Sequence, residues 1–186
     1  MKEQLKGGRL KGGIPRAHLD WVRQQRGERG VEEVLSRLPK EVAAEMRQAL
    51  VTTWCAFGSV ILLDRAIGEL HGPNAIRELG RWSAQQNLST VYRMFRRQDI
   101  HDFFERSAAL HSQFQDFGVE VYERVGDAAG RITHRQYTTF SPTFCESASG
   151  YYEKVMQMHG ATRAVVDHPH CLGRDAKECV FELRWS

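Results

Sequence analysis

The sequence predicts an α+β protein whose N-terminal helices are followed by a four-stranded antiparallel sheet with an inserted helix. Apolar residues recur at helical spacing through most of the first 117 residues. Alternation with a period of two, which is typical of strands, begins after Gly118. The pair Ser141-Pro142 is a helix-start signal that separates two predicted strands from two more. Helices first and then the order β-β-α-β-β favour the α+β class.

Five or six helical segments are expected before the strands. The first is interrupted at Gly27 and Gly30, the second begins at Pro39, and the third stops at His71-Gly72-Pro73. The fourth is long and carries a wide apolar stripe, which is typical of a helix packed on a core. The expected bounds are 14–38, 39–50, 59–70, 74–97 and 100–117.

The C-terminal part is expected to form two pairs of strands around one helix. A short turn containing Gly126 and Gly130 joins the first two strands, so they are expected to pair as a hairpin. Ser141 is the expected N-cap of the helix, and Gly160 the expected end signal. The expected bounds are 119–125, 131–140, 162–167 and 179–185 for the strands and 141–158 for the helix.

The chain length of 186 residues fits one domain, expected over 14–186, with a helical part (14–117) and a sheet part (118–186). Residues 1–13 form a basic, Gly-rich segment that is expected to be flexible or an edge strand. Its glycines do not indicate a phosphate-binding loop, because no Lys-Ser/Thr pair and no apolar strand accompany them.

Composition excludes several classes of function. The net charge is +3 and the basic residues are scattered among acidic ones, so binding to nucleic acid or to a membrane surface is not expected. The uncharged stretch 48–63 is too short and too polar to span a bilayer. Because no secretory signal opens the chain, a cytoplasmic location is expected, where the four cysteines are thiols or metal ligands.

Three cysteines and one histidine have the spacing of a metal site: Cys145, His168, Cys171 and Cys179. Structural zinc prefers four such ligands in a tetrahedron, so the sequence predicts a structural zinc ion that holds the loop between the last two strands. His168 can turn toward the same ion as Cys171 across Pro169. His170 remains an alternative fourth ligand if the chain kinks at Pro169.

From about residue 80 to the C-terminus, the chain resembles the 4-vinyl reductase-type ligand-binding domain of phenol-sensing transcription activators. The matching features are the cysteine at the helix start, the later pair of cysteines, and the closing Cys179-Val180-Phe181-Glu182-Leu183. Those sensors usually have Glu where this chain has His168. The whole chain is also similar to a family of uncharacterised bacterial proteins, through Leu38-Pro39, Gly80-Arg81-Trp82-Ser83-Ala84 and Val91-Tyr92.

This resemblance implies a sensor-like module that binds a small apolar or aromatic molecule and carries structural zinc. The implied fold is shared with haem nitric-oxide sensors and vesicle-tethering subunits. A pocket is expected between the 74–97 helix and the sheet, where Ser83 and Ala84 are small. Aromatic side chains are expected to line it, some of them with a polar group on an apolar body. The candidates are Trp82, Tyr92, Phe104, Phe140 and Tyr152.

Two other functions remain open at this stage. The first is a docking module that binds either a second copy of the same chain or an effector protein. The second is a cysteine-dependent enzyme with Cys145 as nucleophile and His134 or His168 as base. No hydrolase motif supports catalysis, so no catalytic residue is expected. Haem is not expected, since His101 and His111 are not accompanied by the Tyr-x-Ser-x-Arg signature of the haem sensors.

Overall fold

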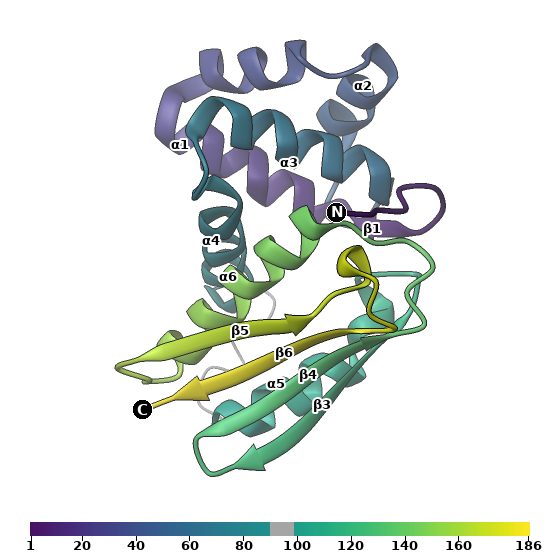
Figure 1. Cartoon of the computed structure of the whole chain (residues 1–186). Coiled ribbons are helices and arrows are strands. Elements are labelled where there is room, and N and C mark those ends of the chain that lie inside the picture. Colours follow the sequence, from purple (N-terminus) through teal and green to yellow (C-terminus); the bar gives the residue numbers. More distant parts are fainter. Residues whose placement is uncertain (90–98) are drawn as a thin grey trace.

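The structure is a computed structural model that describes residues 1–89 and 99–186. Helices α1, α2 and α3 lie at one end and the four-stranded sheet at the other, with α4 and α6 between them (Figure 1). Two hydrophobic cores follow this division, one among the N-terminal helices and one between α4, α5, α6 and the sheet. Among the described residues, no helix is both long enough and apolar enough to cross a membrane.

Helices α1 (Gly13–Ser36), α2 (Lys40–Gln48) and α3 (Phe57–His71) form the first core. The predicted interruption of the first helix is confirmed, because Gly27 has φ 66° and bends α1. A positive φ is easy for glycine and strained for other residues. Pro39 is the N-cap of α2, and Gly72 follows the last residue of α3 with φ 96°, as its terminator signal predicts.

The N-terminal segment pairs with the rest of the chain. Strand β1 (Arg9–Lys11) lies antiparallel to β2 (Trp54–Ala56), a strand that the sequence did not predict. Leu10 of β1 is fully buried opposite Cys55. Gln4 forms an isolated β-bridge with Phe140, so residues 1–13 contact both halves of the molecule.

The next two helices differ in length from the prediction. Helix α4 covers Ala75–Ser89, and the last part of the expected 74–97 helix lies outside the described residues. Helix α5 covers only Ile100–Ala109, with the Asp99 side chain as its cap, and a short 3-10 turn, η2 (His111–Gln113), follows. The expected helix over 100–117 is therefore shorter than predicted. Within its expected range, Gln115 forms a β-bridge with Leu10, which requires extended backbone.

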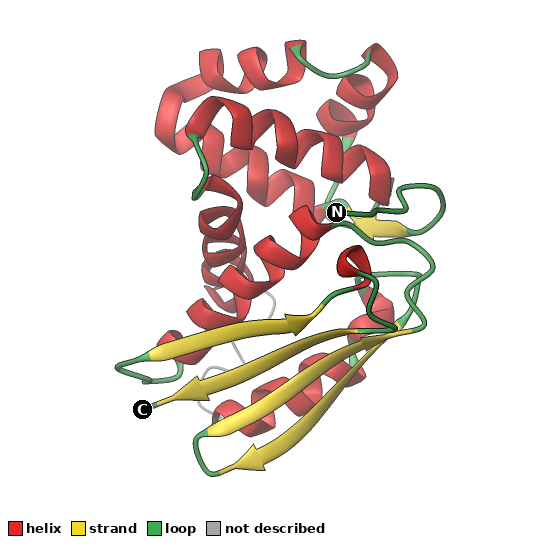
Figure 2. Cartoon of the chain, viewed as in Figure 1, coloured by secondary structure: helices red, strands yellow, loops and turns green. Residues whose placement is uncertain are grey.

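The sheet has the predicted antiparallel arrangement, with strand order β3-β4-β6-β5 (Figure 2). Its strands are β3 (Val119–Gly126), β4 (Ala129–Arg135), β5 (Ala164–His170) and β6 (Cys179–Trp185). The second strand was expected to reach residue 140 but ends at Arg135, because Gln136 has φ 56° and leaves the extended conformation. The α+β class with its β-β-α-β-β order is confirmed.

Helix α6 (Pro142–Met158) connects the two strand pairs. The Ser141 hydroxyl accepts a hydrogen bond from the backbone N–H of Thr143, and Pro142 occupies the first turn, as the sequence predicts. A second, short 3-10 turn, η3 (Leu172–Arg174), lies between β5 and β6. Because α6 packs against α4 and also against β5 and β6, it determines the distance between the helices and the sheet.

Candidate functional site

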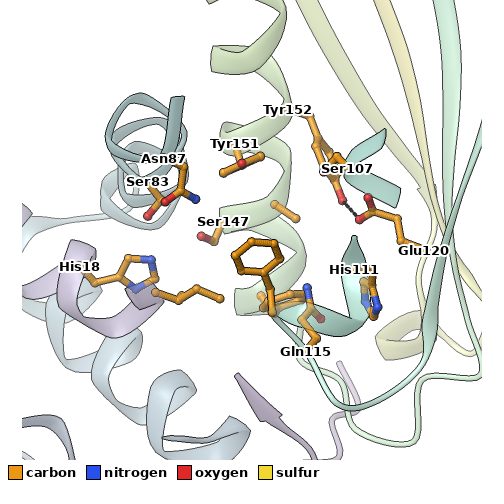
Figure 3. Close-up of a pocket in the computed structure, with 14 residues that line it drawn as sticks. His18, Ser83, Asn87, Ser107, His111, Gln115, Glu120, Ser147, Tyr151 and Tyr152 are labelled. Carbon is orange, nitrogen blue, oxygen red and sulfur yellow. Dashed lines mark hydrogen bonds between the residues drawn. The ribbon is translucent and has the colours of Figure 1, made fainter. Parts of the chain in front are cut away.

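A cavity of about 130 Å³ lies between α1, α4, α6 and the chain that leads from α5 to β3 (Figure 3). An apolar cavity of about 150 Å³ is large enough to hold benzene. The rings of Phe114, Phe144 and Tyr151 give the cavity an apolar interior. Its size and lining therefore suit a five- or six-membered ring.

Small side chains on two packed helices leave this space open. Ser83 of α4 and Ser147 and Ala148 of α6 line the cavity where larger residues would fill it. The Ser83 hydroxyl oxygen is buried and has no hydrogen-bond partner among the described residues. Buried hydroxyl groups are usually hydrogen-bonded, so this oxygen is a candidate to bond a ligand or a water molecule.

Glu120 is the charged residue at the sheet side of the cavity. Its side chain, on β3, is only 9% exposed. Its Oε2 accepts a hydrogen bond from the Tyr152 hydroxyl at 2.9 Å and lies 3.2 Å from Nε2 of His134. Burial alone raises the pKa of Glu120, but His134, with smaller contributions from His111 and Tyr152, outweighs burial and leaves that pKa below its ordinary value. The carboxyl is therefore ionised at neutral pH.

Two histidines line the cavity, and each already has a partner. Nε2 of His111 lies 2.9 Å from the Tyr137 hydroxyl, and Tyr137 in turn donates to Gln115 at 3.3 Å. Burial lowers the pKa of His111, so its ring is neutral at neutral pH. On the helical side, Nδ1 of His18 lies 2.6 Å from Asp64, and both side chains are 2% exposed.

The four predicted metal ligands converge at one place in the second core. The ligand atoms of Cys145, His168, Cys171 and Cys179 all lie within 4.8 Å of one another. The sulfur atoms of Cys145 and Cys179 are 3.6 Å apart. Nε2 of His168 is buried and has no hydrogen-bond partner among the described residues. An unpartnered imidazole nitrogen beside three thiols is the donor set of a metal site.

Local structure brings these side chains together. Cys145 lies in the first turn of α6, and the β5–β6 connection turns back through η3 so that Cys171 and Cys179 meet. The His168 ring stacks on Phe181 at 4.3 Å, which fixes its orientation. His170, the alternative fourth ligand, is exposed and is not part of the cluster.

The thiols of the cluster share protons unequally. A hydrogen bond from Cys145 lowers the pKa of Cys179 to about 4 and that of Cys171 to about 6. Donation to these neighbours raises the pKa of Cys145 itself. A nucleophilic cysteine needs a lowered pKa and access to substrate, whereas Cys145 is buried with a raised pKa. The geometry therefore favours metal binding over a catalytic Cys145.

The predicted pocket residues are mostly elsewhere. Tyr152 lines the cavity, but Phe104 is fully buried against Tyr122 and does not. Trp82 lies on α4 outside the lining, and Phe140 pairs with Gln4 at the N-terminal segment. Tyr92 lies outside the described residues.

The cavity lies beside α4 and α6, and of the expected pocket residues Tyr152 lines it. The cavity also receives residues from α1 and η2, which are far from the 74–97 helix in sequence. Glu120 and His111 were not singled out as pocket residues. The sequence offered one signal for Glu120. It is a carboxylate in a segment with strand-like alternation, so its side chain lies on one defined face of the strand.

Solved structures with the same fold are H-NOX domains. An H-NOX protein from S. oneidensis in the Fe(II)NO ligation state has a TM-score of 0.74 and 15% identity, covering 95% of this chain and 99% of that chain. Unliganded Fe(II) H-NOX from K. algicida has a TM-score of 0.70 and 14% identity, covering 95% and 97%. An oxygen-binding H-NOX domain related to soluble guanylate cyclases has a TM-score of 0.68 and 15% identity, covering 95% and 94%. No protein-family model and no curated protein matches the chain.

These comparisons contradict two expectations. The similar structures are H-NOX domains, so the assignment to the 4-vinyl reductase type is wrong; it depended on a few cysteine positions and a short closing strand. The metal in these similar structures is Fe(II), which contradicts zinc as the cofactor. The zinc expectation failed because thiolate and imidazole ligands define a class of metal ions and do not identify one.

Haem, to which the H-NOX name refers, does not fit the described residues of this chain. Both ring nitrogens of His101 are engaged, by the Tyr122 hydroxyl at 2.6 Å and the Asp127 carbonyl at 3.1 Å. Nε2 of His111 is held by Tyr137. The cavity of about 130 Å³ is below the roughly 300–1,000 Å³ of most ligand and cofactor pockets. No Lys or Arg among the residues described around it offers a partner for haem carboxylates. The chain shares the fold of these H-NOX structures.

Proposed function

We propose that this protein is a sensor-like module that binds a small organic molecule in the cavity between α4, α6 and β3. The observation that carries the proposal is the buried Ser83 hydroxyl, which has no hydrogen-bond partner among residues 1–89 and 99–186, in a cavity of about 130 Å³. Folded proteins rarely leave a buried hydroxyl without a hydrogen-bond partner, and a ligand in the cavity supplies that partner.

The ligand is a compact ring of about five or six heavy atoms. Its affinity comes from apolar contact with the aromatic lining, at about 25 cal/mol per Å² of buried surface. A ring that buries roughly 150 Å² gains about 4 kcal/mol before ordering costs, which corresponds to millimolar binding. Hydrogen bonds to the polar lining then supply selectivity and further affinity.

The fold supports a sensing role. The similar H-NOX structures include complexes with NO, CO and oxygen, all of which are small molecules. The same fold with a small cavity in this chain is suited to a small ligand that is not held by haem. Helix α6 lines the cavity and also contacts the sheet, so it is the element that transmits occupancy to the surface.

Ligand-observed NMR with benzene tests this proposal. The native protein is expected to bind benzene, whereas Ala148→Leu, which fills the cavity, is expected to abolish the signal. Ala109→Leu is the matched control because Ala109 is an exposed residue of α5 outside the lining. Equal benzene signals from Ala148→Leu and native protein, or no signal from native protein, would contradict binding in this cavity.

We also propose that Cys145, His168, Cys171 and Cys179 bind one thiophilic metal ion. The support is the approach of all four ligand atoms to within 4.8 Å, together with Nε2 of His168, which has no hydrogen-bond partner in the described part of the chain. Lowered thiol pKa values for Cys171 and Cys179 favour the thiolate forms that bind metal. This site is structural, since it joins α6 to the β5–β6 loop.

Elemental analysis of the purified protein tests this second proposal and identifies the ion. About one metal ion per chain is expected, and chelation is expected to lower the melting temperature and expose three thiols to thiol reagents. Cys171→Ser should lose the metal, whereas Cys55→Ser should retain it, because Cys55 is buried in the other core. Metal-free native protein that also takes up no added Co(II) would contradict the site.

A further inference from the structure

One charged side chain faces the cavity, and it is acidic. The described residues around the cavity include Glu120 but no Lys, Arg or Asp. Burial lowers the pKa of His111, which also lines the cavity, so that its ring is neutral at neutral pH. The described lining therefore offers a carboxylate acceptor and no Lys or Arg side chain.

Glu120 has an unused acceptor atom. Both of its described hydrogen-bond contacts, from the Tyr152 hydroxyl and from Nε2 of His134, go to Oε2. An ionised carboxylate has about four lone-pair positions on its two oxygens and accepts hydrogen bonds without donating any. Oε1 therefore accepts no hydrogen bond from the described residues and is available to a ligand.

Ser83 and Asn87 are polar residues that lie across the cavity from Glu120. Figure 3 shows Ser83 and Asn87 on the α4 side and Glu120 on the sheet side, with Tyr151 and Ser147 of α6 between them. The cavity thus has polar groups at two ends and aromatic rings in the middle. A ring compound with a polar group at its sheet end matches this arrangement.

We infer that the ligand of this cavity is a ring compound that carries an N–H or O–H hydrogen-bond donor, neutral or cationic, which Glu120 accepts through Oε1. This inference depends on the proposed small-molecule function and adds the chemical class of the ligand. Hydrogen bonds to charged acceptors are stronger than neutral ones, so the donor determines selectivity. A carboxylate ligand is disfavoured because it would place two negative charges in one small site.

Two isosteric pairs of probes test the inference. Pyrrole and furan have the same ring size, but only pyrrole has an N–H donor; pyrrolidinium and tetrahydrofuran form the equivalent cationic and neutral saturated pair. The donor member of each pair is expected to bind about tenfold more tightly, which is the ratio expected for one net hydrogen bond to a charged group. Dissociation constants are measured by NMR titration of the native protein.

Two variants assign this preference to Glu120. Glu120→Gln is expected to bind furan as the native protein does but to lose most of the preference for pyrrole. Glu123→Gln is the matched control on the same strand, because that side chain is 63% exposed. A second measurement does not depend on whether the variants fold. The ¹³C chemical shift of the Glu120 carboxyl in native protein should change when pyrrole is added and should not change when furan is added.

Equal affinities for pyrrole and furan would overturn the inference, while leaving the small-molecule function intact if both bind. A preference for pyrrole that survives in Glu120→Gln would overturn the role of Glu120. If no probe binds, including benzene, the proposed function itself fails. The three results are therefore distinguishable.

Discussion

Gly150 of α6 lies so close to Arg77 of α4 that a Cβ atom on the glycine would be 2.0 Å from the Arg77 carbonyl oxygen. The contact is reciprocal, since a Cβ atom on Gly80 of α4 would be 1.8 Å from the carbonyl oxygen of Ser147. The two helices thus touch backbone to backbone, which only glycine permits. This close approach also sets the width of the cavity, because Ser83 and Ser147 line it from the same two helices.

Gly150→Ala is expected to destabilise the protein by about 2 kcal/mol or more, as overpacked cores do. The steric cost exceeds the gain of about 1 kcal/mol that alanine brings to a helix interior. The measurement is the free energy of unfolding in urea. Gly126→Ala is the control, because a Cβ atom there has only an ordinary contact of 3.8 Å with Ala129. A stable Gly150→Ala variant would show that the helices separate easily.

Helices α4 and α6 are also joined by ion pairs between two arginines of α4 and a glutamate of α6. Glu153 of α6 accepts hydrogen bonds from Arg77 at 2.5 Å and from Arg81 at 2.6 Å, and its side chain is 10% exposed. Glu153→Gln is expected to cost about 2 kcal/mol of unfolding free energy, since the partly exposed arginines lose a buried partner. Glu146→Gln, at a 47% exposed site that also bonds Arg77, is expected to cost less than about 1 kcal/mol. Similar losses from both variants would contradict the importance of burial.

His111 predicts a specific pH dependence of stability. Its pKa is lowered in the folded protein by burial, so the unfolded chain binds a proton more readily than the folded chain does. The stability that neutral His111 contributes is therefore complete above the unfolded pKa of about 6.5 and is lost as the pH falls below it. His111→Gln should have a shallower loss of unfolding free energy between pH 6.5 and 5. Parallel curves for the two proteins would contradict a lowered pKa.

Local signals predicted much of the fold. The Ser141-Pro142 helix start, the bend at Gly27 and the hairpin between β3 and β4 depend on residues that are close in sequence, and all three are confirmed. The spacing of three cysteines and His168 also predicted their convergence. The spacing does not identify an ion, because several thiophilic metals accept the same ligands.

The lining of the cavity depends on contacts between distant elements, which periodicity does not reveal. Val119 and Val125 are 44% and 51% exposed, while the Glu120 side chain is 9% exposed. The alternation identified the β3 strand, yet Glu120 faces inward while the two valines are exposed. The buried Glu120 carboxylate is stabilised by His134 of β4 and Tyr152 of α6. These partners are distant in sequence, so no local pattern predicts them.

Binding of a small ring compound in the cavity is tested most directly by intermolecular NOE measurements on the native protein with benzene. The methyl groups of Ala148 and Ile14 both line the cavity and serve as reporters. Cross-peaks from bound benzene to these two methyl groups are the predicted result, and Ala148→Leu should remove them. Saturable benzene binding without a cross-peak to either methyl group, or no binding at all, would contradict the proposed function.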